Sequence, residues 1–303
     1  EEAAKVSSKF FRETAKDDRP FYVQVYFFET HRRFSFGGAK PDLSKGVYIP
    51  PYIIDEPSAR KDFAEFQGAI RKVDASIGTI LKALEDTGLS ENTIVIYTVD
   101  HGIPFPRAKM TPYDAGIEVA CLIRWPAGGW TGGKVYDHMI SNVDVLPTIL
   151  DLLDIPIPKN VHGRSFLGLL NGTDYEPRTI LYAESYGWGD PRRCIRTKTH
   201  KLIANFRPGT SFKNCTGTWR PLSQSKIGNC TSRHPWIELY DLVKNPLESK
   251  NVVGNPEYEP LQKELMKRLL KWMEETDDPL LERVPMPPMH KKTLQKLRDA
   301  ARN

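Results

Sequence analysis

The residues best suited to chemistry lie in one stretch, residues 100–109 (DHGIPFPRAK). Asp100 offers a hard carboxylate oxygen of the kind that Ca²⁺ or Mg²⁺ binds. His101 can ligate through a ring nitrogen or hydrogen-bond a bound anion, and Gly102 permits a tight turn. A lysine held beside a metal, as Lys109 would be, neutralises charge on a transferred sulfuryl or phosphoryl group. The alternative is that Asp100 caps a turn and Lys109 is solvated.

A second candidate is His31, which follows the apolar run of residues 21–28 (FYVQVYFF). A histidine there could protonate a leaving group or bind an anionic oxygen. A lone histidine is also common as an ordinary surface or core residue. Arg32 and Arg33 could add anion contacts or be solvated.

The elements around these residues predict that they share a site. Residues 21–28 and 93–98 (TIVIYT) read as buried strands, and residues 58–86 read as a long amphipathic helix capped by Ser58. Strand, helix and strand in this order predict a right-handed parallel crossover. Because ligands bind beyond the carboxyl ends of parallel strands, His31 and the Asp100-His101 pair should point at the same edge.

The later part of the chain predicts a change of architecture. Shorter strands separated by turns, followed by one amphipathic helix, indicate a small antiparallel sheet packed by that helix. The expected division is a larger α/β domain over residues 1–177, a smaller one over 178–280 and a basic tail over 281–303. The remaining elements are expected as strands at 119–125, 180–184, 194–197, 201–205 and 236–240, and as helices at 144–153 and 256–275.

Composition excludes several classes of protein. Among the 303 residues no apolar run approaches the roughly 18 to 20 that a membrane helix needs. The net charge of +5 is mild, and without an aromatic-interleaved basic patch it gives no sign of a nucleic-acid partner. Much of the excess lies in the basic tail, which is expected to be solvated or to attract an anionic substrate or membrane surface.

Cysteine and asparagine motifs bear on the compartment. Cys121 lies in an apolar run and reads as a small core residue, whereas Cys215 and Cys230 flank a polar loop that a disulfide could close. Glycosylation triplets begin at Asn171, Asn214 and Asn229. The chain opens without Met or a signal-peptide core, so we expect a piece of a longer protein for which export stays open.

These motifs together resemble a known family. Asp100-His101-Gly102 followed by Lys109 resembles the C-terminal metal-and-sulfate segment of the sulfatases, which belong to the alkaline-phosphatase-like superfamily. The resemblance is sharpest to the heparan N-sulfatase (sulfamidase) branch and spans about residues 10–280. It is carried further by Thr30-His31-Arg32, Pro50-Pro51-Tyr52, Ile103-Pro104-Phe105-Pro106, Tyr113-Asp114-Ala115-Gly116, Ile195-Arg196-Thr197, His200-Lys201-Leu202-Ile203, Glu238-Leu239-Tyr240-Asp241-Leu242 with Asn245-Pro246, and Lys271-Trp272.

The resemblance implies a fold and a set of roles. The fold would be α/β, a mostly parallel sheet flanked by helices with a smaller C-terminal antiparallel sheet and helix. Asp100 would be a ligand of one calcium ion, and His101, standing where many members have Asn, would bind metal or substrate. Lys109 would contact the sulfate, and His31 would contact the sulfate or protonate the leaving group, which makes these two the catalytic candidates.

One part of the family's machinery has no counterpart in this chain. Sulfatases convert a Cys or Ser in Cys/Ser-X-Pro-X-Arg to formylglycine, whose hydrate attacks sulfur. None of the four cysteines fits that pattern, and the motif's place in the family lies N-terminal to residue 1. The chain is therefore expected to hold the metal-and-sulfate half of a site and to be inactive alone.

The expected function is hydrolysis of a sulfuric ester or N-sulfate on a sulfated glycan. We expect an exported protein (periplasmic, extracellular or lysosomal), and the sequence leaves a homodimer open. Two alternatives stay open. One is a phosphomonoesterase or phosphodiesterase of the same superfamily, with a Ser or Thr nucleophile and two transition-metal ions; the other is a non-catalytic glycan-binding pseudoenzyme.

Overall fold

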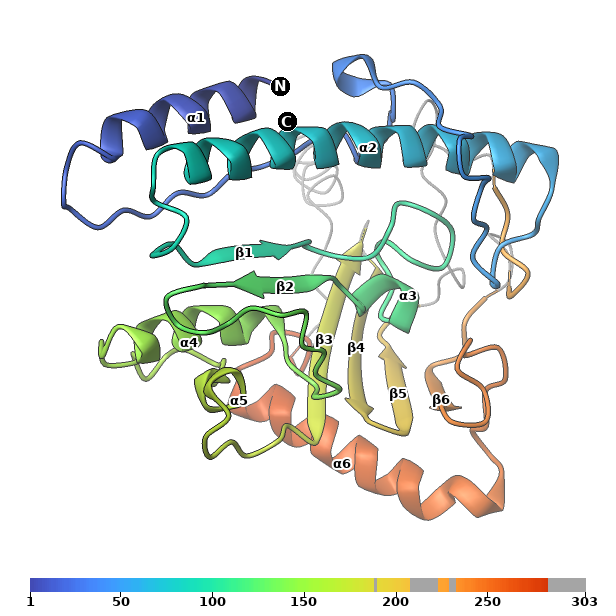
Figure 1. The fold of residues 1–303 in the computed structure, drawn as a ribbon. Helices are drawn as coiled ribbons and strands as arrows, with labels where there is room; N and C mark the ends of the chain where they lie inside the picture. Colours follow the sequence, from blue (N-terminus) through green and yellow to red (C-terminus); the bar gives the residue numbers. More distant parts are fainter. Residues whose placement is uncertain (188–189, 208–222, 229–232, 283–303) are drawn as a thin grey trace, which may run out of the picture.

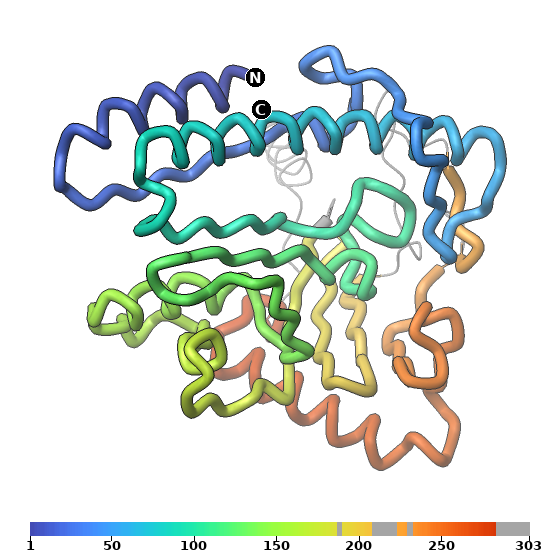
Figure 2. The backbone as a smooth tube through the Cα atoms, viewed as in Figure 1, coloured from blue at the N-terminus to red at the C-terminus, as the bar shows by residue number. Residues whose placement is uncertain are grey.

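A computed structural model describes residues 1–187, 190–207, 223–228 and 233–282 of the chain. Helices α1 (Glu2–Thr14) and α2 (Pro57–Asp86) form one layer. Below it lie a two-stranded sheet and, at a steep angle to that sheet, a four-stranded one with helix α6 (Glu259–Glu275) packed against it (Figure 1; Figure 2). The molecule is thus a mixed α/β protein.

Helix α2 is the longest element and carries the core of the upper layer. It begins at Pro57, where the absence of an N–H costs nothing because the first helical N–H groups have no partner within the helix. Its buried aromatic residues Phe63 and Phe66 pack against Phe34 and Phe105 from the loops on either side of it. The predicted helix over 58–86 is confirmed, with Glu56 rather than Ser58 as its N-cap residue.

The two-stranded sheet differs from the prediction. Strands β1 (Val95–Thr98) and β2 (Cys121–Arg124) form where strands were expected, but they pair antiparallel. The prediction of a strand at residues 21–28 is wrong: this run joins no sheet, and Tyr22, Tyr26 and Phe28 are exposed. The mostly parallel sheet and its crossover are not confirmed, since every strand pair of the described residues is antiparallel.

The physical reason lies in what a strand needs. A lone strand makes no hydrogen bonds within itself, so its backbone N–H and C=O groups stay unpaired until a neighbouring strand bonds to them. No described segment forms a ladder with residues 21–28, so their β propensity alone does not make a strand.

The C-terminal sheet confirms the second part of the prediction. Its four strands run in the order β3-β4-β5-β6, and all three pairings are antiparallel. Ile195, Leu202 and Leu239 on one face pack against Leu265 and Leu269 of α6. The strands are β3 (Ile180–Gly187), β4 (Asp190–Thr197), β5 (His200–Asn205) and β6 (Ile237–Asp241).

Short helices connect the two sheets. The predicted helix over 144–153 is present as α4, and α3 and α5 are single turns or little more. A capping box between Ser141 and Asp144 fixes the entry to α4. Between the two sheets the chain forms η2 (Asn142–Asp144), α4 (Val145–Leu152) and α5 (Leu167–Asn171). The other short helices are η1 (Phe36–Gly38) before α2, α3 (Asp114–Ile117) between β1 and β2, and η4 (Pro256–Tyr258) before α6.

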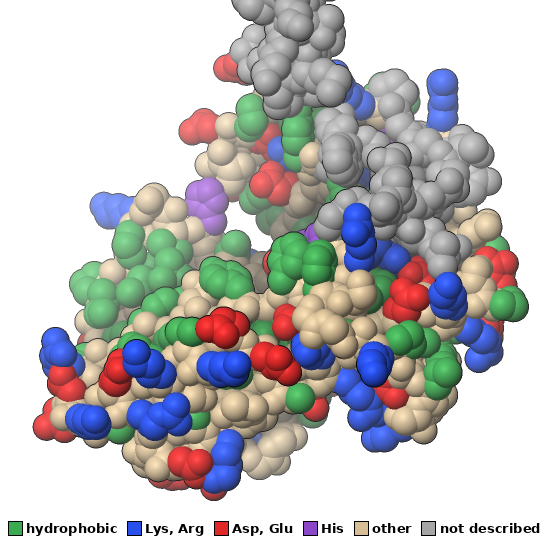
Figure 3. Space-filling view, turned by 90° about the horizontal axis from the view of Figure 1, so that it is seen from above, with side chains coloured by type: hydrophobic (Ala, Val, Ile, Leu, Met, Phe, Trp, Pro, Cys, Tyr) green, Lys and Arg blue, Asp and Glu red, His purple; other side chains and the backbone are tan. Residues whose placement is uncertain are grey.

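The surface carries both signs of charge. Lys and Arg side chains lie among Asp and Glu over the face seen in Figure 3, with hydrophobic side chains gathered on one part of it. Of the helices that the structure describes, none has the length and apolar character to cross a membrane. The expected Cys215–Cys230 disulfide and nearly all of the basic tail fall outside the described residues.

Candidate active site

A wide cleft is lined by two of the sequence candidates and by the chain neighbours of the other two. It lies between α2, the two-stranded sheet and the edge strand β3, and β1 ends at it. Asp100 and His101 follow β1 directly and line the cleft, as does Thr30, the neighbour of His31. Met110, the neighbour of Lys109, lines it too, together with Thr111 and Ser185.

The side chains of Asp100 and His101 lie close together at the start of the loop of residues 100–109. The His101 Nδ1–H donates to the carbonyl oxygen of Gly102 at 2.8 Å, because a carbonyl can only accept. Nε2 then lies 3.2 Å from Oδ2 of Asp100. When the His101 ring is neutral, its Nε2 carries a lone pair that faces the lone pairs of the Asp100 Oδ2. The contact is therefore favourable only with a proton or a cation between the two atoms.

This spacing also fits a bound cation. Two ligand atoms at right angles, each about 2.3 Å from the ion, lie about 3.3 Å apart. The Asp100 side chain is 84% exposed, which leaves its remaining lone pairs accessible. No group of three or more His, Cys, Asp and Glu side chains capable of holding a metal occurs in the described part of the chain. Asp100 and His101 therefore fit as part of a ligand set that other residues must complete.

The loop that carries Lys109 is held by close backbone contacts. The Gly102 N–H donates to the carbonyl oxygen of Gly116 at 2.8 Å, and a Cβ on Gly102 would lie 1.9 Å from the oxygen of Ala115. The loop thus needs glycine there for close approach, and not only for the turn expected from the sequence. The Lys109 N–H donates to Ile103 at 3.0 Å. Its half-buried side chain has no ion-pair partner among the described residues.

His31 is oriented by its own neighbours. Its ring stacks on Phe28 with 4.9 Å between centroids, and its Nδ1–H donates to the carbonyl oxygen of Arg32 at 2.6 Å. The lone pair of the neutral ring is then on Nε2. His31 can therefore exchange a proton through Nε2 while Nδ1 fixes the ring.

Arg32 has a different role from the anion contact considered above. It is 7% exposed, and its guanidinium donates to both carboxylate oxygens of Asp62 at 2.6 and 2.8 Å. Its Nε–H donates to the carbonyl oxygen of Pro104 at 2.9 Å. A guanidinium satisfied in this way is part of the scaffold and does not face the cleft as an anion ligand.

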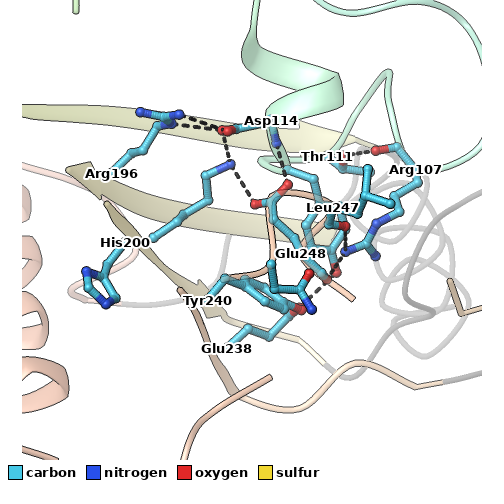
Figure 4. A network of polar contacts seen from close by, with 12 residues as sticks. Arg107, Thr111, Asp114, Arg196, His200, Glu238, Tyr240, Leu247 and Glu248 are labelled. Atoms are coloured by element: carbon cyan, nitrogen blue, oxygen red, sulfur yellow. Dashed lines mark hydrogen bonds and ion pairs between the residues drawn. The ribbon is translucent and has the colours of Figure 1, made fainter. Parts of the chain in front are cut away.

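A buried ionic cluster joins helix α3 to strands β4 and β5 (Figure 4). The sequence does not indicate how the residues of this cluster pair. Lys201 on β5 is fully buried between Asp114 at 2.5 Å and Glu248 at 2.7 Å. Arg196 on β4 adds a bidentate pair to Asp114 with both contacts at 2.9 Å. Burial alone would raise the pKa of Asp114, but Arg196 and Lys201 hold it below its usual value. Burial raises the pKa of Glu248, opposed by Lys201.

A second buried set lies beside it. Glu238 accepts from the hydroxyl groups of Tyr113 at 2.8 Å and Tyr240 at 2.5 Å, and burial raises the pKa of both phenols. Arg107, from the Lys109 loop, lies over the Tyr113 ring at 3.7 Å and donates to the backbone carbonyl of Glu248 (Figure 4). The only signal in the sequence was that Tyr113-Asp114 and residues 238–242 lie in segments typical of the family.

Comparison with known proteins decides the family. The family model described as Sulfatase matches residues 1–155, which is just over half of the chain. The chain belongs to the sulfatase family. A second model, described as N-sulphoglucosamine sulphohydrolase, C-terminal, matches residues 105–213 of this sulfatase chain.

Curated relatives extend this likeness. Human N-sulphoglucosamine sulphohydrolase is 29% identical over 316 residues, covering 87% of this chain and 62% of the human protein. An ulvan-active sulfatase of Formosa agariphila is 33% identical over 232 residues, covering 73% of this chain and 45% of its own length. The sulfatase chain therefore spans less than two thirds of the length of these relatives.

Solved structures agree at the level of the fold. A structure in complex with its substrate D-glucosamine-2-N,6-O-disulfate matches with a TM-score of 0.58 and 25% identity, over 73% of this chain and 42% of that one. A 2-O glycosaminoglycan sulfatase matches with a TM-score of 0.65 and 20% identity, over 94% and 66%.

Proposed function

We propose that this chain forms the metal-and-sulfate half of a sulfatase that hydrolyses a sulfuric ester or N-sulfate on a sulfated glycan. The observation that supports this most is the environment of three polar groups beside one cleft. Asp100 and His101 converge as cation ligands, and Lys109 has no ion-pair partner among the described residues. Charged groups left unsatisfied by the fold are suited to a charged ligand.

Each residue then has a distinct task. Asp100 and His101 would hold one calcium ion, which when bound draws charge from the sulfate oxygens. The Lys109 ammonium would neutralise charge that develops on the sulfuryl group. His31 would keep its ring fixed through Nδ1 and donate a proton from Nε2 to the leaving oxygen or nitrogen. The attacking formylglycine would come from a preceding segment of the polypeptide.

The rest of the proposal concerns the whole protein. Sulfated carbohydrate as substrate follows from the names of the relatives, of which N-sulphoglucosamine is one. We propose that the whole protein contains a mostly parallel sheet flanked by helices, as the family resemblance implies. The proposed domains are residues 1–177 and 178–280, with a tail over 281–303. We also propose an exported protein, and a homodimer as its assembly.

Sulfate release tests the proposal. The full-length protein, incubated with N-sulfoglucosamine and with a simple aryl sulfate, should release inorganic sulfate and contain one calcium ion per chain. The 303-residue chain under the same conditions is the control and should release none. Phosphate release with two zinc ions per chain would favour the phosphoesterase alternative. Glycan binding without release of either anion would favour the pseudoenzyme.

A further inference from the structure

Arg32 contacts both His31 and the loop of residues 100–109 that carries the other site candidates. Its carbonyl oxygen accepts the Nδ1–H of His31 at 2.6 Å, and its Nε–H donates to Pro104 at 2.9 Å. Pro104 lies between the Asp100-His101 pair and Lys109. We propose that Arg32 is a positioning residue that sets His31 and the Lys109 loop in register, an inference that rests on the function proposed above.

The guanidinium is itself fixed from several directions. Asp62 on α2 is 1% exposed and binds it with both oxygens, and Asp62 also accepts from the Ser223 hydroxyl at 3.2 Å. The guanidinium carbon lies 4.6 Å from the ring centre of Phe34 and 4.7 Å from that of Phe105. Arg32 therefore ties the loop to a rigid helix.

A short series of contacts connects Arg32 to the backbone of Lys109. Arg32 touches the loop at Pro104 and at Phe105. The Phe105 N–H donates to Ile103 at 2.8 Å, and Ile103 also accepts from the Lys109 N–H at 3.0 Å. Displacing Pro104 and Phe105 would therefore move the backbone of Lys109.

A lysine cannot reproduce this arrangement. The planar guanidinium binds Asp62 in a bidentate way, reaches Pro104 with a third N–H and lies over two rings, whereas an ammonium is a single point charge. We expect Arg32→Lys to keep the charge and most of the burial while releasing the loop.

Arg193 supplies a matched control. It is 5% exposed and binds Asp278 with both oxygens at 2.5 and 3.0 Å, which makes it the same kind of buried pair. It lies on β4 and, among the described residues, its side chain contacts Arg192, Glu184 and Asp278, all of which lie outside residues 100–109. Arg193→Lys should therefore cost a similar amount of stability and leave the site in place.

The experiment compares the two variants in the full-length protein. At a temperature where circular dichroism shows both to be folded, kcat and KM are measured for the sulfate substrate, and inorganic sulfate binding is measured by calorimetry. Arg32→Lys should lower kcat on the order of 10²-fold, since a displacement of about 1 Å has that effect. It should also weaken sulfate binding about tenfold, whereas Arg193→Lys should change neither by more than about twofold.

Each result is decisive. Equal losses of kcat in the two variants would show that Arg32 acts only on stability and would overturn the proposal. If Arg32→Lys does not fold, Asp62→Asn replaces it. This variant keeps the bond between Arg32 and Pro104 and should give an intermediate loss of kcat. A loss of kcat no larger than that of Arg193→Lys would count against a positioning role for Arg32. A wild-type protein that binds sulfate but releases none would contradict the proposed function alone. One that does not bind sulfate would contradict both.

Discussion

Two lysines of this chain lie in opposite environments. Lys201 is fully buried and contacts two carboxylates, whereas Lys109 is half-buried and has no ion-pair partner among the described residues. The difference is that the fold neutralises the Lys201 ammonium and gives the Lys109 ammonium no ion-pair partner among the described residues, which is why we propose a ligand for Lys109.

The aspartates repeat the contrast. The Asp114 side chain is 18% exposed and paired with Arg196 and Lys201, whereas that of Asp100 is 84% exposed and contacts only His101 among the described residues. Buried charges must be paired because desolvation is otherwise prohibitive. Exposed charges can stay unpaired and remain available to bind.

The charges of the buried ionic cluster and those beside the cleft differ in their environment and not in residue type. Asp and Lys occur both in the ionic cluster and among the site candidates of residues 100–109. Removing a scaffold charge should change stability, and removing a site charge should change turnover. Four substitutions or titrations test whether that separation holds.

The largest expected effect is that of Lys201→Ala. It leaves Asp114 and Glu248 buried with less compensation, which costs about 3–5 kcal/mol of unfolding free energy. Urea denaturation measures this loss. Lys198→Ala, at an exposed position two residues beyond Arg196, is the control and should stay within about 0.5 kcal/mol of the native protein. A small change in Lys201→Ala would mean that the cluster is not structural.

The next effect is on rate. Lys109→Ala in the full-length protein should lower kcat about 10²- to 10³-fold, a loss of about 2.7–4 kcal/mol of transition-state stabilisation. Its melting temperature should change little, since no ion pair is lost. Lys134→Ala is a matched control because Lys134 is an exposed lysine that lines the same cleft. Turnover like that of the native protein in Lys109→Ala would remove Lys109 from the site.

A third and smaller effect is expected from calcium. A cation that binds only the folded full-length protein stabilises it by about 2.7 kcal/mol at a concentration 100 times its Kd. Thermal unfolding with and without calcium measures this gain. Asp100→Asn should abolish most of it, whereas Asp137→Asn, at an exposed aspartate, should preserve it. An unchanged gain in Asp100→Asn would place the ion elsewhere.

The sequence predicts features that depend on residues close in the chain better than features that depend on residues far apart in it. The long helix and the C-terminal sheet were recovered because their apolar periodicity is local. The predicted strand at residues 21–28 is absent from the structure, because a strand exists only beside a partner and the local sequence does not show whether a partner is present. The sequence alone suggests an anion ligand or a solvated group at Arg32, because its partner Asp62 lies 30 residues away on α2.

The site was predicted unevenly for the same reason. Asp100, His101 and Lys109 share one segment with a recognisable spacing, so they could be proposed together. The ionic cluster joins Asp114, Arg196, Lys201 and Glu248, which meet only after the chain has folded. Charge pairing across 82 and 87 residues leaves no periodic pattern in the sequence.

The smallest expected effect is the pH dependence of that cluster. The pKa of Asp114 is lowered, so its contribution to stability is present above its ordinary pKa of 3.8 and is lost as the pH falls through the folded value. The pKa of Glu248 is raised, so its contribution is present below the ordinary 4.5 and is lost as the pH rises through the folded value. Together the two carboxyls favour the folded state most near pH 4.

This prediction also tests whether the cluster behaves as scaffold. A single group changes the unfolding free energy by at most about 1.4 kcal/mol per pH unit. Urea denaturation between pH 4 and 7 should show that the stability of the native protein falls more steeply with rising pH than that of Glu248→Gln. The glutamine cannot ionise at this position. It keeps an oxygen that can accept from the Asp114 N–H, a bond of 2.7 Å in the native protein. Parallel curves would mean that Lys201 compensates Glu248 fully. The cluster would then resemble an ordinary exposed ion pair in its response to pH, and burial would no longer distinguish it from the cleft.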